Sequence, residues 1–390
     1  MPAFETRLGR YEATSVAGET VRAYVPRPLP PDPPVDLERF QLALEEANQA
    51  VGRLDGVAAI LPDPSLFLYM YIRKEALLSS QIEGTQSSLS DLLLFEAEEA
   101  PGVPVDDTQE VSNYVAAMNH GLARLREDFP LSLRLIREIH AILLSQGRGQ
   151  DKDPGEFRRS QNWIGGTRPG NALFVPPPPH LVMTCLGELE TFIHAQTPPL
   201  PLLVKAALVH VQFETIHPFL DGNGRLGRLL ITFLLCERGV LREPLLYLSL
   251  YFKQNRQTYY QLLQSVRESG TWEDWVEFFL RGVSETARQG AQTAQNLLRL
   301  FGNDHARIEA LGRPASTALR LHQLLQRRPL TTIQDASRQL GLSLPTVTSA
   351  LSHLRTLGIV RETTGRQRGR IFVYGAFLDV LSEGTDPLPP

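Results

Sequence analysis

Residues 217–228 (HPFLDGNGRLGR) constrain the fold of this chain more than any other segment, because they predict a turn between two helices. The helical pattern before them ends at His217, since the residue before a proline is pushed out of the helical region of backbone space. A second apolar helical pattern starts just after Gly224 and ends at Gly239, and a glycine at that place is typical of a helix end. The sequence therefore predicts a helix–loop–helix turn with a glycine-rich loop.

The loop of this turn has the properties of a phosphate-binding site. Gly222, Asn223 and Gly224 can adopt left-handed or crowded backbone angles, so that their N–H groups converge at the positive end of the second helix. Asp221 stands at the rim, and a carboxylate beside bound phosphates is a common way for a protein to hold Mg²⁺. The loop thus predicts a seat for phosphates with a metal ligand next to it.

Charged and titratable side chains flank the same loop. Arg225 and Arg228 are three positions apart on the second helix, so we expect both guanidinium groups to reach one phosphate ligand. His217 is the group of this segment that can take up a proton near neutral pH, as a hydroxyl nucleophile requires. The set predicts phosphoryl or nucleotidyl transfer.

With all eight specified positions matched, residues 217–228 resemble the signature of the Fic family, His-x-Phe-x-Asp/Glu-Gly-Asn-Gly-Arg-x-x-Arg. Fic enzymes typically transfer AMP from ATP to a Ser, Thr or Tyr hydroxyl of a protein and release pyrophosphate. The resemblance implies ATP and Mg²⁺ as cofactors, His217 as the base that deprotonates the target hydroxyl, and Asp221 as the metal ligand. It further implies that the α- and β-phosphates contact Gly222, Asn223 and Gly224, the diphosphate Arg225, and the γ-phosphate Arg228.

Upstream, residues 79–84 (SSQIEG) resemble the inhibitory motif of the same family, Ser/Thr-x-x-x-Glu-Gly/Asn. The preceding apolar run has no internal proline or glycine and predicts a helix over 65–84 that ends at Gly84. Ser79 and Glu83 then lie on one face of that helix, a turn apart. The resemblance implies that Glu83 pairs with Arg228 and inhibits the enzyme in cis.

Residues 155–179 are rich in turn-forming residues and separate two helical patterns, with candidate strands at 163–164 and 173–175. A hairpin is the natural interpretation, and the alternative is a plain surface hairpin without a role. In Fic proteins this place is the flap, which clamps the target segment by strand addition. The resemblance therefore implies that the target contacts Ile164, Gly165 and Gly166.

Residues 251–260 (YFKQNRQTYY) resemble the helix that borders the adenine pocket in Fic proteins. The resemblance implies that Tyr259 and Tyr260 contact the nucleotide. Aromatic residues at helical spacing more often pack in a core, which is the alternative interpretation of this pair.

The region 313–378 differs from the rest of the chain in charge. It holds ten Arg, no Lys and two acidic residues, a formal charge of +8 (10 − 2), whereas the whole chain carries −4. Thr331 and Gln334 are expected to form the capping box of its second helix. The pattern predicts a helix over 316–326, a helix that ends at Gly341, a helix capped by Ser343 and ending at Gly358, and strands at 359–360 and 370–374 around the basic turn 365–369. This order describes a winged helix-turn-helix, which binds nucleic acid or docks a protein.

The sequence as a whole predicts a mainly α-helical protein. We expect an extended N-terminal arm over 1–36, a Fic-type helical bundle with a β-hairpin flap over 37–308, a C-terminal winged helix-turn-helix domain over 313–378 and a tail over 379–390. Two cysteines cannot form a secreted disulfide framework. Because the sequence has neither a signal peptide nor a long apolar stretch, we expect a cytoplasmic protein without a membrane partner.

The expected function is that of a protein adenylyltransferase acting on Ser, Thr or Tyr of target proteins and of itself. Two alternatives stay open: a DNA-binding transcription regulator that senses nucleotide through its Fic fold, and Fic-type transfer or removal of another phosphate-containing group. His217 favours catalysis over sensing, since a sensor needs the phosphate seat but no base. The sequence leaves open a homodimer, DNA at the winged helix, the target protein and the signal that relieves inhibition.

Overall fold

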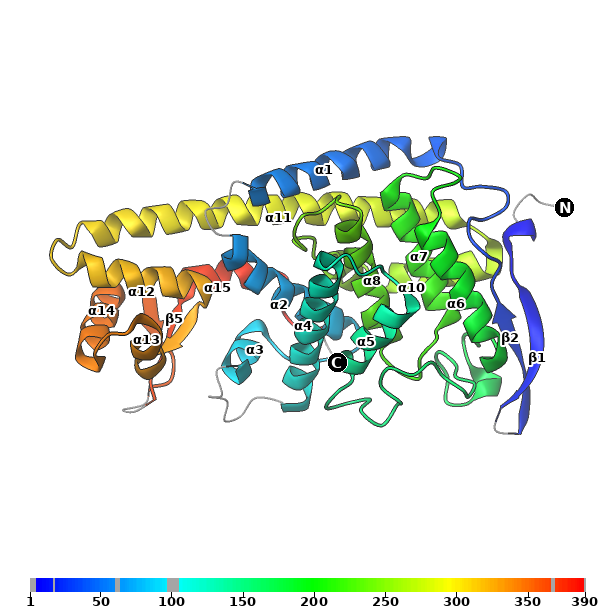
Figure 1. The fold of residues 1–390 in the computed structure, drawn as a ribbon, viewed down its shortest axis with the longest axis horizontal. Helices are drawn as coiled ribbons and strands as arrows, with labels where there is room; N and C mark the ends of the chain where they lie inside the picture. The colour runs from blue at the N-terminus through cyan, green and yellow to red at the C-terminus, as the bar shows by residue number, and fades with distance from the viewer. Residues whose placement is uncertain (1–4, 17, 60–63, 97–104, 366–368, 389–390) are drawn as a thin grey trace.

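Helices make up most of the fold, as the sequence predicts, and one small antiparallel sheet lies toward each end of the elongated molecule (Figure 1). The structure is a computed structural model that describes residues 5–388 except 17, 60–63, 97–104 and 366–368. In the described part, no helix combines the length and the apolar character needed to cross a membrane.

The N-terminal region contains a hairpin, which corrects the expectation of a simple extended arm. Strands β1 (Arg10–Val16) and β2 (Glu19–Val25) pair antiparallel along their whole length, with Arg10 opposite Val25. Successive side chains of each strand point to opposite faces, so that one face of the hairpin packs against the protein and the other faces solvent. Arg7, before the hairpin, forms a buried ion pair with Glu273 at 2.8 Å. The region is therefore anchored to the helical body.

The helical body packs its helices on a hydrophobic core whose centre is α7, where every residue from Leu203 to Ile216 is buried. A helix that is buried on all sides lies inside a bundle, so α7 anchors the turn that follows it. The short helix α9 was not expected from the sequence. The helices are α1 (Gln41–Ala59), α2 (Pro64–Ile82), α3 (Leu89–Glu96), α4 (Val105–Arg126), α5 (Leu133–Leu143), α6 (Pro179–His194), α7 (Leu202–Ile216), α8 (Asn223–Glu237), α9 (Ser249–Gln254), α10 (Arg256–Ser269) and α11 (Trp272–Glu309).

Helix α11 links the two halves of the molecule. It has 38 residues, about 57 Å at 1.5 Å per residue, and α1 packs along it (Figure 1). Its carboxyl-terminal end leads into α12 (Ala315–Arg327), so the C-terminal region is built on the end of a helix that starts in the helical body.

The winged helix predicted for 313–378 is present. It consists of α12 (Ala315–Arg327), β3 (Leu330–Thr332), α13 (Ile333–Leu340), α14 (Leu344–Thr356), β4 (Val360–Glu362) and β5 (Ile371–Tyr374), and its sheet has the order β3-β5-β4. Ser343 caps α14, as predicted. The cap of α13 is Thr332, whose hydroxyl accepts from the N–H of Asp335 at 3.1 Å. The predicted Thr331 box is therefore wrong, because α13 begins at Ile333 and the residue directly before it is Thr332. Residues 366–368 of the wing turn lie outside the described residues.

After the wing, helix α15 (Gly375–Ser382) returns to the helical body and contacts both α11 and α2. Tyr374, at the junction of β5 and α15, donates its hydroxyl to Asp304 of α11 at 2.7 Å, and both side chains are buried. A single hydrophobic cluster extends through both regions. The winged helix is therefore packed against the helical body at this joint.

Candidate active site

His217 lies where the sequence places the helix break, as the residue that ends α7. Its backbone is left-handed (φ 48°), and its carbonyl accepts hydrogen bonds from Arg158 (2.9 Å) and Asn162 (3.3 Å). The side chain is 19% exposed. Burial, with Arg267 and Arg158 nearby, lowers the pKa of His217 to about 3. The imidazole is therefore neutral in this structure, as a general base must be.

Asp221 occupies the rim of the turn, and a buried histidine supports the backbone there. Its carboxylate accepts from the N–H of Gly222 at 2.6 Å and is 35% exposed. Its carbonyl is 3.0 Å from Nε2 of His140, whose Nδ1 accepts from the N–H of Gly155 at 2.8 Å. Because Nδ1 accepts, the proton is on Nε2 and is donated to the carbonyl of Asp221. The turn is thus held by a residue that sequence reasoning did not identify.

The glycine turn has the conformation expected of a phosphate seat. Gly222 is left-handed (φ 77°) and caps α8, whose first N–H groups lack partners within the helix. The side chain of Asn223 is buried and closes the turn, since its amide accepts from the N–H of Phe219 and donates to the carbonyl of Phe219, each at 2.9 Å. Asn223 therefore acts on the loop through its side chain, and only its N–H is left for a ligand.

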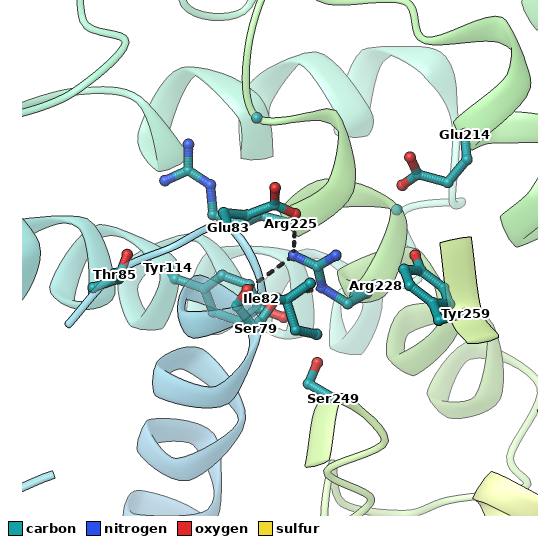
Figure 2. A network of polar contacts seen from close by, with 12 residues as sticks. Ser79, Ile82, Glu83, Thr85, Tyr114, Glu214, Arg225, Arg228, Ser249 and Tyr259 are labelled. Carbon is teal, nitrogen blue, oxygen red and sulfur yellow. Dashed lines mark hydrogen bonds and ion pairs between the residues drawn. The ribbon is translucent and has the colours of Figure 1, made fainter. Parts of the chain in front are cut away.

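The two arginines of α8 point in different directions, each toward carboxylates of the protein (Figure 2). Arg225 lies 3.4 Å from Glu110 of α4 and 3.7 Å from Asp221, and it is 1% exposed. Arg228 points instead toward the end of α2. The reason is that carboxylates from different elements attract each guanidinium. The sequence gives no signal for Glu110, which also pairs with Arg148 at 2.9 Å.

Arg228 is held by Ser79 of α2 and by Glu83, which directly follows that helix. It donates from Nε to the hydroxyl of Ser79 (2.8 Å), and from Nη2 to the carbonyl of Ser79 (2.9 Å) and to Oε1 of Glu83 (2.7 Å) (Figure 2). A Cβ added at Gly224 would lie 2.3 Å from Oε1 of Glu83, so only a glycine permits this approach. Gly84, next to Glu83, has φ 103°, which suits the residue that ends the helix.

The charges of this cluster shift one another. Burial opposes ionisation of Glu83, but Arg228 outweighs it, so the pKa of Glu83 is lowered. Burial raises the pKa of Glu214 to about 7, although Arg228 opposes this. The carboxylate of Glu214 is 4.0 Å from Nδ1 of His217. The pair Glu83–Arg228 is therefore ionised, and a second carboxyl group that the sequence reasoning missed stands beside the histidine.

Comparison with known families decides the relationship. Residues 41–123 match the family model described as "Fic/DOC family N-terminal", and residues 130–235 match that of the "Fic/DOC family". The chain thus contains a Fic/DOC N-terminal domain and a Fic/DOC domain. Residues 315–361 match a model described as "Winged helix-turn-helix DNA-binding", in agreement with the fold of that region.

Similar proteins carry the same family name. The Protein adenylyltransferase Fic of Aedes aegypti is 35% identical over 192 residues, 48% of this chain and 35% of the relative. That of Drosophila grimshawi is 29% identical over 255 residues, 64% of this chain and 48% of the relative. The chain thus spans less than half the length of these curated relatives.

Solved structures agree on the Fic fold. A Fic family protein from Desulfovibrio desulfuricans covers 88% of this chain, with 97% of its own length matched, at a TM-score of 0.56 and 20% identity. A Fic domain containing signaling protein from Bacteroides thetaiotaomicron covers 64% of this chain, with 95% of its own length matched, at a TM-score of 0.51 and 21% identity. At these identities the likeness concerns the fold.

The flap of this chain is shorter in β-structure than predicted. Of the expected strands, only Ile164 and Phe174 form a β-bridge. Gly165 and Gly166 both have positive φ (67° and 72°), which turns the chain away from strand pairing. Leu173 is 77% exposed. Ile164 therefore lies in the paired part of the flap, and Gly165 and Gly166 lie in its turn.

The base of the flap is tied to the Fic loop by side chains that sequence reasoning missed. The buried Arg158 donates to the carbonyls of His217 (2.9 Å) and Pro177 (2.6 Å). Asn162 donates to the carbonyl of Phe219 at 2.9 Å. On the outer side, the N–H of Tyr24 in β2 donates to the carbonyl of Val175 at 2.8 Å. The N-terminal hairpin therefore braces the flap.

The tyrosine pair of α10 separates into two environments. Tyr259 is 1% exposed, stacks on Phe252 and accepts or donates a hydrogen bond with His210 at 2.9 Å. This corrects its expected role at the nucleotide, because a side chain enclosed in an aromatic core has no surface for a ligand. Tyr260 is 40% exposed, with the guanidinium of Arg256 over its ring. It remains a candidate for contact with adenine.

Proposed function

We propose that this chain is a protein adenylyltransferase that transfers AMP from ATP to Ser, Thr or Tyr hydroxyl groups of target proteins and of itself. The observation that carries the proposal is the place of His217 at the end of α7, followed by the turn of Gly222, Asn223 and Gly224, whose N–H groups begin α8. A base and a phosphate seat on one rigid loop are what attack on a phosphorus atom requires. The names of the curated relatives support the same activity.

In the proposed reaction His217 removes the proton of the target hydroxyl, and the oxygen forms a bond to the α-phosphorus of ATP. The bond between that phosphorus and the α–β bridging oxygen breaks, and pyrophosphate leaves with the electron pair. The N–H groups of the Gly222–Gly224 turn would bind the α- and β-phosphates, and Arg225 would neutralise charge on the diphosphate. These groups would lie where negative charge develops, so they would stabilise the transition state more strongly than they stabilise bound ATP.

The residues at the rim of the turn fit Mg²⁺. Asp221 presents a partly exposed carboxylate beside the phosphate seat. Among the described residues no group of three or more acidic, His or Cys side chains could bind a metal by itself. This suits Mg²⁺, which is commonly held by one or two carboxylates together with substrate phosphates and water. When bound, the ion would neutralise charge on the phosphates, and Asp221 would be its protein ligand.

We further propose that Glu83 inhibits the enzyme in cis. The resemblance to Fic enzymes implies that Arg228 binds the γ-phosphate of ATP. In this structure its guanidinium group contacts Ser79 and Glu83 instead. Because Arg228 is only 2% exposed, a phosphate could reach it only after Glu83 has left. The closed arrangement therefore disfavours a productive ATP pose.

For the winged helix we propose contact with nucleic acid. The region 313–378 carries a formal charge of +8 (10 − 2), and its fold is one that places a helix in a DNA groove. This proposal concerns a partner of the enzyme and is independent of the adenylyltransferase reaction.

Replacement of the base tests the proposed activity. His217→Ala should lower AMP incorporation from α-labelled ATP by roughly 10²–10⁴-fold, measured on the chain itself and on lysate proteins with Mg²⁺. ATP binding should persist, since the phosphate seat does not use the imidazole. His305→Ala is the matched control, because His305 is an exposed histidine of α11. Undiminished incorporation by His217→Ala would remove His217 from the mechanism.

A further inference from the structure

The segment that follows α15 (residues 383–388, the tail segment) lies against the carboxyl-terminal end of α2, far along the chain from it. In Figure 1 α15 runs from the winged-helix region toward α2. Thr385 is 4% exposed. Gly384 has φ 76° and packs so closely on Leu250 that an added Cβ would lie 2.8 Å from it. The tail segment is therefore seated in a fitted position.

The contact is made by a buried polar hub. Gln81 of α2 is fully buried, and its amide N–H₂ donates to the carbonyls of Thr385 (2.8 Å) and Ser87 (2.9 Å). The ammonium group of Lys253 in α9 donates to the side-chain oxygen of Gln81 (2.7 Å) and to the carbonyls of Gly384 (3.1 Å) and Asp386. Lys253 is 5% exposed. The amide nitrogen and the amide oxygen of Gln81 therefore both have their hydrogen-bond partners in this hub.

Loss of the tail segment would remove acceptors from both Gln81 and Lys253. A buried donor that loses its partner costs more than the hydrogen bond contributed, and a buried ammonium group costs more still. Lys253 would retain one acceptor of three, and the Gln81 amide nitrogen one of two. The end of α2 is therefore more stable with the tail segment in place.

The hub is two residues from Glu83 on the same helix end. Gln81 faces α9 and the tail segment, whereas Glu83 faces Arg228 of α8. Arg256 adds a third attachment, since its Nε donates to the carbonyl of Ile82 at 3.1 Å. Glu83 cannot swing away from Arg228 by a movement of the helix end unless Gln81 leaves the hub. The tail segment and the inhibitory contact are therefore mechanically linked.

The winged helix is linked to the same hub through α15. Strand β5 ends at Tyr374, α15 starts at Gly375, and the tail segment follows α15 directly. The N–H and hydroxyl of Thr385 both bond to the carbonyl of Ser382, which fixes the angle at which the tail segment leaves the helix. A displacement of the winged helix that moves α15 would therefore pull on Thr385.

We propose that the tail segment is a latch that keeps α2 in the inhibitory position, so that displacement of the winged helix releases the enzyme. The consequence for activity rests on the proposed adenylyltransferase function. The latch itself is a statement about the stability of the end of α2, and it can be measured without any reaction.

The test compares the whole chain with a chain that ends at Glu383. Backbone amides of residues 77–85 should exchange with deuterium on the order of 10-fold faster in the shortened chain, because the hub loses acceptors worth about one charge-assisted hydrogen bond. AMP incorporation should rise by a similar factor, about 10-fold. In the Glu83→Gly background the truncation should change incorporation less than about 2-fold, because the inhibitory contact is already absent.

Two substitutions keep the test decisive if the shortened chain does not fold. Lys253→Met removes the ammonium group and keeps the length of the side chain, and we expect the same increase in exchange over residues 77–85. Lys205→Met is the matched control, since Lys205 is also buried and donates to a backbone carbonyl, that of Ala195 in another part of the molecule. It should leave exchange in residues 77–85 unchanged.

The outcomes separate the latch from the reaction. Unchanged exchange over residues 77–85 in both the shortened chain and Lys253→Met would overturn the latch. Faster exchange without AMP transfer by any variant, Glu83→Gly included, would support the latch and refute the adenylyltransferase function. If truncation activates the Glu83→Gly chain as strongly as the original chain, the tail segment does not act through α2, and the proposal fails.

Discussion

Replacing Glu83 by glycine removes one contact of Arg228 and leaves two. The lost contact is the 2.7 Å hydrogen bond between Nη2 of Arg228 and Oε1 of Glu83, whereas both bonds to Ser79 remain. A hydrogen bond between charged groups contributes about 1.5–3 kcal/mol. Glu83 is 30% exposed, so solvent screens the pair and the lower end of that range applies, which corresponds to about 10-fold. We therefore expect Glu83→Gly to raise AMP incorporation about 10-fold.

The assay uses α-labelled ATP with Mg²⁺ and follows labelling of the chain itself and of lysate proteins. The double variant Glu83→Gly, His217→Ala must lose the gain, since activation requires the base. Glu83→Gln keeps the shape of the side chain and a neutral hydrogen bond, so its activation should be smaller than that of Glu83→Gly. If Glu83→Gly is folded by circular dichroism and is no more active than the original chain in either labelling experiment, Glu83 is an ordinary carboxylate at a helix end.

Two further predictions concern the winged-helix region. Binding of the full chain to duplex DNA should weaken with salt, and the logarithm of the binding constant should fall against the logarithm of the salt concentration with a slope of roughly −0.9 per phosphate contact. Arg355→Ala, which removes an exposed cation of α14, should reduce this slope by about one. No binding at low salt would leave protein docking as the role. Burial lowers the pKa of His322 to about 4. As the pH falls, the unfolded chain therefore takes up a proton near pH 6.5, before the folded chain does. The stability that neutral His322 contributes is present above pH 6.5 and is lost as the pH falls toward 4. Between pH 7 and pH 5 the free energy of unfolding, measured with urea, should therefore fall by about 2 kcal/mol less for His322→Gln than for the original chain. Equal decreases would contradict a buried neutral His322.

Local signals predicted the elements that position the chemistry. The break at His217 followed from the proline after it, the start of α8 from the glycines, and the cap of α14 from Ser343. Each depends on backbone preferences within a few residues. The same kind of signal was one residue off at Thr331, because two threonines stand in a row and the helix begins after the second of them.

The sequence by itself determined the catalytic loop, the helical class of the fold and the winged helix, because each is encoded by residues within a few positions of one another. Apart from the pair of Glu83 and Arg228, which the family resemblance implied, only the tertiary structure decided what the charged side chains of the site contact. Arg225 turns toward Glu110, more than a hundred positions away. Gln81 meets the tail segment about three hundred positions later. No spacing rule connects such residues, because these contacts arise only when separate helices pack on a common core and bring buried polar groups within reach of one another.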